Sequence, residues 1–131
     1  MNFTVPEKII AKRNQVAVAD VVVQVKSGYH VNSTKPSDSY LIPLRFTWAE
    51  DVVKVEEVSY PEPKMEKLAF SEKPVSVLDG SIKTKTRFKV PASAPLGMTS
   101  LNGKLRYQAC NDRMCLPPRT LDVKIPLDIR N

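Results

Sequence analysis

Residues 81–90 read SIKTKTRFKV, and they alternate strictly between apolar or threonine side chains and basic or serine ones. Because successive side chains of a β-strand point to opposite faces, this pattern predicts a strand with one buried face and one wet face. Eleven prolines leave few windows in which a helix could form. Comparable strand patterns occur at residues 15–26, 40–48, 52–60, 100–109 and 119–129.

Seven or so strands joined by short connections rich in proline and aspartate predict an all-β fold, an immunoglobulin-like antiparallel β-sandwich. A small barrel is the alternative. The chain of 131 residues fits a single domain spanning 1–131, long enough to build its own core. Phe46 and Trp48 are expected in that core. The stretch 61–74 is expected to be irregular and is a candidate functional loop.

The net charge of +6 raises the question of an anionic partner. One face of the strand at 81–90 is basic, but it lacks the interleaved aromatic residues that stack on nucleic-acid bases. We therefore expect a solvated outer face that resists edge-to-edge aggregation, and no nucleic-acid partner. The basic residues of this face are Lys83, Lys85, Arg87 and Lys89.

The longest apolar stretch, residues 16–25, is too short to span a bilayer and is interrupted by Asp20. The chain does not open with a charged segment, an apolar core and a cleavage site of small residues. We therefore expect a cytosolic protein, a mature exported protein or a domain of something larger. Two cysteines do not choose among these possibilities.

Both cysteines lie in YQACNDRMCLPP, residues 107–118. Cys110 ends one predicted strand and Cys115 precedes the next, so NDRM is predicted to be the tip of a hairpin-like turn with the cysteines facing across its neck. A turn tip would expose the sulfur atoms, and Pro117 and Pro118 would stiffen the chain beyond Cys115.

Three interpretations of this pair remain open. A closed zinc site needs four ligands, and His30 alone cannot complete one. A structural disulfide would close a loop of about six residues, worth roughly 2 kcal/mol. A reversible dithiol–disulfide needs an accessible sulfur and a second thiol to resolve the mixed disulfide, and the turn offers both. His30 itself is expected at the surface or supporting the site as a polar residue, with metal ligand or proton carrier as alternatives.

The order YQAC, short acidic turn, CLPP and strand resembles the active-site segment of the amino-terminal domain of the thiol:disulfide interchange protein DsbD and of related disulfide-corrector domains, which share YQ-x-C followed by C-x-P-P. Residues 28–48, GYHVNSTKPSDSYLIPLRFTW, resemble the glycine-aromatic segment after the second strand of that family. The turn between the cysteines has four residues, fewer than in the best-known members.

The resemblance implies a monomeric immunoglobulin-like domain of the bacterial periplasm that needs no cofactor. It would be part of a membrane-embedded protein, receive electrons from that protein's carboxy-terminal thioredoxin-like domain, and pass them to periplasmic isomerases, reductases or cytochrome c maturation. Cys110 and Cys115 match the redox pair, with Cys115 forming the mixed disulfide and Cys110 resolving it.

The family also shields its disulfide with a cap loop that carries an aromatic residue. The corresponding stretch here is 64–73, which makes Phe70 the candidate cap residue. Tyr29 and His30 correspond to a region near the site. The rival hypothesis is a non-catalytic binding or assembly module with a structural hairpin disulfide and recognition by the basic face.

Overall fold

A computed structural model describes residues 1–36, 41–67 and 74–131. Its regular elements are all strands, which confirms the all-β prediction. They are β1 (Asn2–Thr4), β2 (Ile9–Lys12), β3 (Val16–Gln24), β4 (His30–Asn32), β5 (Arg45–Trp48), β6 (Lys54–Ser59), β7 (Lys64–Glu66), β8 (Val75–Leu78), β9 (Ser81–Lys89), β10 (Gly97–Tyr107), β11 (Ala109–Cys110) and β12 (Arg119–Arg130). No helix in the described part of the chain is long and apolar enough to cross a membrane.

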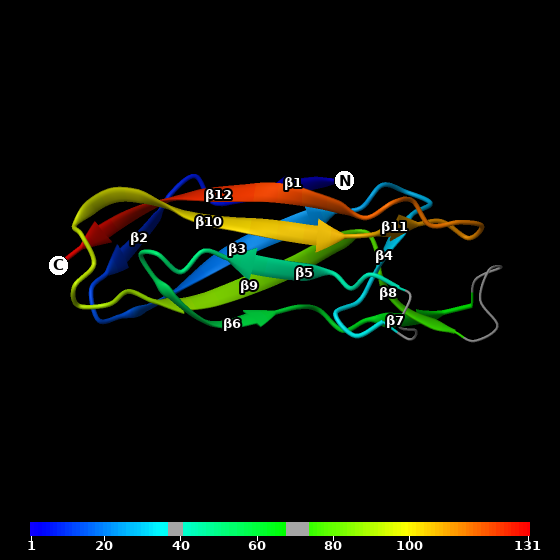
Figure 1. The fold of residues 1–131 in the computed structure, drawn as a ribbon, viewed down its shortest axis with the longest axis horizontal. Helices are drawn as coiled ribbons and strands as arrows, with labels where there is room; N and C mark the ends of the chain where they lie inside the picture. Colours follow the sequence, from blue (N-terminus) through cyan, green and yellow to red (C-terminus); the bar gives the residue numbers. More distant parts are fainter. Residues whose placement is uncertain (37–40, 68–73) are drawn as a thin grey trace.

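The strands form three sheets (Figure 1). Two of them, ordered β1-β3-β9-β6 and β2-β12-β10-β5, contain the long strands and make the body of a β-sandwich. The third sheet, ordered β11-β4-β8-β7, lies at the end of the molecule away from the C-terminus (Figure 1). Neighbouring strands are antiparallel except β12 and β2, which run parallel, so the expected purely antiparallel arrangement needs this one correction.

The sandwich core consists of the side chains that the alternating patterns placed on one face. In β9, Ile82 and Phe88 are fully buried, as are Thr84 and Thr86 between them. Thr84 Oγ1 donates to the carbonyl oxygen of Val21 at 2.8 Å, so its hydroxyl keeps a hydrogen bond inside the core. The other buried residues include Ala19, Val21, Val23, Leu101, Leu105, Val123, Ile125 and Leu127.

Phe46 and Trp48 of β5 are buried in this core, as expected. Their rings stack with centroids 5.3 Å apart, and Trp48 Nε1 donates to Thr86 Oγ1 at 2.9 Å. The polar edge of the indole therefore has a partner inside the core, which is what its burial requires.

The basic face of β9 is exposed, as the alternation predicted. Two of its cations form surface ion pairs, Lys85 with Asp20 at 3.5 Å and Arg87 with Glu56 at 3.2 Å. Such exposed pairs contribute little to stability, so the face is solvated without adding much to the free energy of unfolding.

Four expectations about elements were wrong. The strand predicted at 40–48 is confined to β5, because Pro43 cannot donate to a ladder. The stretch 61–74 contains β7, which pairs with β8, so it is not wholly irregular. The strand predicted at 100–109 is interrupted at Gln108, which separates β10 from β11. The short strands β1, β2, β4 and β8 were not predicted, because three or four residues carry too little periodicity to be distinguished from a loop.

Candidate functional site: a half-buried disulfide on the small sheet

The two cysteines form a disulfide at the neck of a tight turn, as the sequence indicated. The S–S bond is 2.06 Å long and the two Cα atoms are 4.0 Å apart. Cys110 ends β11, and Cys115 forms an isolated antiparallel bridge with it. The Leu116 amide donates to the carbonyl oxygen of Ala109 at 2.8 Å, which closes the neck below the sulfur atoms.

The turn is held by Asn111, a residue that the sequence reasoning missed. Its Oδ1 accepts hydrogen bonds from the amides of Arg113 and Met114, both at 2.8 Å. Its own amide donates to the carbonyl oxygen of Met114 at 2.9 Å. An asparagine directly after a strand is a turn-forming signal of this kind and could have been recognised. The backbone of the turn is therefore fixed independently of the disulfide.

The two cysteines differ in their access to solvent. Cys110 is fully buried, whereas Cys115 is only partly buried and packs against a small apolar cluster. The expectation that the turn exposes both sulfur atoms is therefore wrong for Cys110, because β11 inserts it beside β4 in the small sheet. The cluster under Cys115 consists of Leu41, Val75 and Val77.

The register of the small sheet explains which side chains surround the disulfide. Cys110 is paired with His30, and Val77 is paired with Asn32 and with Lys64. Since directly paired residues share a face and alternate residues along a strand return to it, one face carries the site. Its members are Cys110, His30, Asn32, Val75, Val77, Lys64 and Glu66, and the opposite face sends Val31, Leu78 and Ala109 to the main core.

Gln108, the glutamine of the YQAC motif, ties the segment after residue 40 to this sheet. Its Oε1 accepts from the Ile42 amide at 3.2 Å, while Asn32 Nδ2 donates to the carbonyl oxygen of Ile42 at 3.0 Å. Leu41, next to Ile42, is thereby placed in the cluster that Cys115 contacts. Sequence reasoning gave Gln108 no role of its own, although the motif contained it.

His30 is 95% removed from solvent, so of the two positions expected for it the surface one is wrong, and the role of a polar residue that supports the site stays a prediction. Its Nδ1 lies 4.0 Å from Oε2 of Glu66, a residue of β7 that was not predicted to reach the site. Its Nε2 is buried and has no hydrogen-bond partner among the described residues. Burial lowers the pKa of His30 below its usual 6.5, while the carboxylates of Glu66 and Asp79 oppose that shift.

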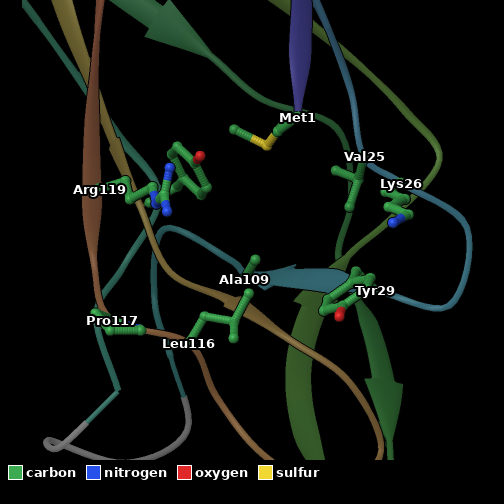
Figure 2. A pocket seen from close by; sticks show the side chains of 9 residues that line it. Met1, Val25, Lys26, Tyr29, Ala109, Leu116, Pro117 and Arg119 are labelled. Atoms are coloured by element: carbon green, nitrogen blue, oxygen red, sulfur yellow. The ribbon is translucent and has the colours of Figure 1, made fainter.

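Two hollows flank the site. One, of about 170 Å³, is polar and is lined by His30, Tyr29, Glu66, Asp79, Asp112 and Gly28. The other, of about 220 Å³, is more apolar, and Leu116 and Pro117, which follow Cys115, form part of its wall (Figure 2). Tyr29 lines both hollows, so the structure places it near the disulfide segment, as the sequence suggested.

Phe70, the candidate cap residue, lies outside the described residues. The described residues also hold no group of three or more histidine, cysteine or acidic side chains arranged to bind a metal ion.

The buried His30 predicts that the oxidised domain loses stability in mild acid. Because its pKa is lower in the folded chain than the ordinary 6.5, the unfolded chain binds the proton more readily. The free energy of unfolding, measured by urea denaturation, should therefore include the whole contribution of neutral His30 above pH 6.5. It should decrease as the pH falls below that value. His30→Gln should flatten this dependence. The same slope in both proteins would contradict it.

A family model for the thiol:disulfide interchange protein DsbD, N-terminal, matches residues 2–126. The comparison with curated proteins found no match. Two of the solved structures that match are only distantly similar. A family 123 glycoside hydrolase from Clostridium perfringens is 15% identical with a TM-score of 0.44, over 95% of this chain and 23% of the hydrolase. The Escherichia coli fimbrial subunit AggA is 6% identical with a TM-score of 0.45, over 98% of this chain and 93% of AggA.

Similarities as low as these two do not bear on function, whereas the family match extends over nearly the whole chain and includes both cysteines. The described disulfide lies in the segment that carries the YQ-x-C and C-x-P-P elements. The chain belongs to the family of the N-terminal domain of the thiol:disulfide interchange protein DsbD, a family of thiol-disulfide interchange domains.

Proposed function

We propose that this domain is a periplasmic electron relay that works by opening and closing the Cys110–Cys115 disulfide. It takes two electrons from a thioredoxin-like domain of its own membrane-embedded protein and gives them to periplasmic thiol–disulfide proteins. Cys115 is the sulfur that contacts the partner, and Cys110 resolves the mixed disulfide. The domain acts as a monomer and needs no cofactor.

The unequal burial of the two cysteines carries this proposal. Exchange begins when a thiolate approaches a disulfide sulfur, so the attacked sulfur must be reachable. Cys115 is partly exposed at the end of the turn, whereas Cys110 is fully buried beside β4. This difference favours Cys115 as the contact sulfur on physical grounds, in agreement with its position in the family motif.

The surroundings of Cys115 support contact with a partner protein. The exposed side chains of Met114 and Leu116 flank it along the chain. Leu116 and Pro117 also form part of the wall of the apolar hollow beside the turn (Figure 2). The flexible side chain of Met114 can adapt to differently shaped partners, which suits a relay that meets several proteins.

A purely structural disulfide fits the architecture less well. Asn111 already holds the turn through three hydrogen bonds, two accepted by its side-chain oxygen and one donated by its backbone amide, and the closed loop is short. A bond that closes about six residues stabilises a chain by roughly 2 kcal/mol, against about 5 kcal/mol for a loop of 100 residues. The sandwich has an extensive core of its own. Phe70 as the cap residue and Tyr29 as a shielding residue remain proposals that follow from the family resemblance.

Two measurements test the relay. The reduction potential of the pair should lie above about −300 mV, since structural disulfides of secreted proteins lie below that value. In addition, when Cys110→Ser is mixed with a thioredoxin-like protein in its disulfide form, the thiolate of Cys115 should open that disulfide and a mixed disulfide through Cys115 should accumulate, because the Cys110 thiol that would resolve it is gone. Mass spectrometry of the non-reduced adduct identifies the linked cysteine, and Cys115→Ser is the matched control.

A potential below about −300 mV without any exchange would favour the structural alternative, a binding or assembly module. Trapping through Cys110 in the Cys115→Ser variant, and none in Cys110→Ser, would reverse the two roles while retaining the relay.

A further inference from the structure

We propose that His30 is the proton acceptor for the buried thiol of Cys110 when the reduced domain passes on its electrons. This inference rests on the proposed exchange function and assigns a step within it. It gives a chemical role to a residue for which the family motif YQ-x-C and C-x-P-P contains no counterpart.

The pairing of β11 with β4 places the two residues side by side. Cys110 and His30 are direct partners in the antiparallel register, so both side chains lie on the same face of the small sheet. The Cβ atoms of such partners are about 4.5–5.5 Å apart, which is within the reach of an imidazole ring. Both side chains are removed from solvent. A proton leaving Cys110 therefore meets His30 before it meets bulk water.

The surroundings of His30 leave one ring nitrogen available. Nδ1 faces the Glu66 carboxylate at 4.0 Å, which favours the tautomer that carries its proton on Nδ1. Nε2 is then an acceptor, and it is the buried side-chain atom without a hydrogen-bond partner among the described residues. In the disulfide form the Cys110 sulfur carries no proton. Reduction turns it into an S–H donor on the same face.

Cys110 needs such an acceptor because its surroundings disfavour a thiolate. Burial raises the free energy of the charged form, and a thiol in an apolar site is inert until it is deprotonated. The polar hollow beside His30 adds negative charge from Glu66, Asp79 and Asp112. The exposed Lys64 lies 2.9 Å from Asp79 and offsets part of this charge. Negative charge opposes a thiolate but stabilises a protonated imidazole.

The step balances as follows. Cys115 is joined to the acceptor protein in a mixed disulfide, and Cys110 is a thiol. Cys110 gives its proton to Nε2 of His30 and attacks the Cys115 sulfur. The Cys110–Cys115 bond forms, the bond to the acceptor breaks, and the acceptor leaves as a thiolate. The domain loses two electrons and the acceptor gains them. His30 then releases the proton through the acidic hollow to solvent.

The test uses the reduced domain and 5,5′-dithiobis(2-nitrobenzoate) in a stopped-flow instrument. The first released thiolate reports attack by Cys115, and the second reports closure by Cys110. His30→Gln should slow the second phase about 100-fold at pH 7, within the range for loss of a general base. The first phase should be unchanged. Above pH 6.5 the native second phase should be nearly independent of pH, whereas that of the variant should rise about tenfold per pH unit.

Equal pH profiles for the second phase in the two proteins would overturn the proposal. A merely structural role for His30 would change the rate of that phase but not how the rate depends on pH. Glu66→Gln is the second variant, because Glu66 is about half exposed and its replacement should not impair folding. The rate of the second phase should fall in acid as His30 becomes protonated. In Glu66→Gln this fall should occur at lower pH, because Glu66 raises the pKa of His30. A fall at the same pH in both proteins would also overturn the proposal. Failure of the relay itself is separate, since it would appear as the absence of a mixed disulfide between Cys110→Ser and the oxidised thioredoxin-like protein, whatever the pH profile of the second phase.

Discussion

Replacing Gly103 by alanine is expected to lower the free energy of unfolding by about 3 kcal/mol, the upper end of the usual cost of overpacking a core. Gly103 of β10 is the direct partner of Trp48 of β5. A Cβ atom at residue 103 would lie 2.9 Å from both Cδ2 and Cζ3 of the indole and closer still to Cε3. Real carbon atoms do not approach so closely, so the ring or the strand must shift.

Trp48 has little freedom to move away. Its ring stacks on Phe46, and its Nε1 donates to the buried Thr86 hydroxyl at 2.9 Å. A shift that relieves the clash would break this hydrogen bond inside the core, where an unpaired N–H is costly. The expected loss is measured by urea denaturation of the oxidised domain.

Lys104→Ala is the matched control, because Lys104 is the next residue of β10 and its exposed ion pair with Asp122 should be worth little. It should change the free energy of unfolding by less than about 0.5 kcal/mol. In a Trp48→Leu background the cost of Gly103→Ala should shrink, as a double-mutant cycle would record. An unchanged cost in that background would show that the clash with Trp48 is not the cause.

The reduced domain is expected to react with iodoacetamide about 100 times faster at Cys115 than at Cys110. Cys115 is partly exposed, whereas Cys110 can react only when the small sheet opens locally. A factor of 100 corresponds to an opening free energy of roughly 3 kcal/mol. Peptide mass spectrometry after timed quenching gives the two rates separately, and the single-cysteine variants Cys110→Ser and Cys115→Ser provide the controls.

In urea the two rates should become similar, because the difference comes from burial and not from the thiols themselves. Similar rates in the folded protein would contradict the assignment of Cys115 as the contact sulfur. The expected burial effect is distinct from the role of His30, since alkylation of Cys115 involves neither closure of the disulfide nor its proton acceptor.

The sandwich could be predicted from local patterns. Alternation in β3, β9, β10 and β12 predicted correctly which face of each strand is buried. Successive side chains point to opposite faces, so only one assignment places the apolar residues in the core. The neck of the Cys110–Cys115 turn was also predictable, since the two cysteines lie five residues apart in a tight connection between two predicted strands. The parallel pairing of β2 with β12 was not, because it joins opposite ends of the chain.

The sequence by itself determined the long strands, the two-cysteine motif and the position of the disulfide, because each depends on neighbours along the chain. Only the tertiary structure decided which sulfur is buried and what stands beside it. Cys110 meets His30 through the pairing of β11 with β4, and Glu66 reaches the same face through β8 and β7. These contacts join short strands that are far apart in sequence. The burial of a side chain depends on which segments pack over it, and the residues next to it in the chain do not specify those segments.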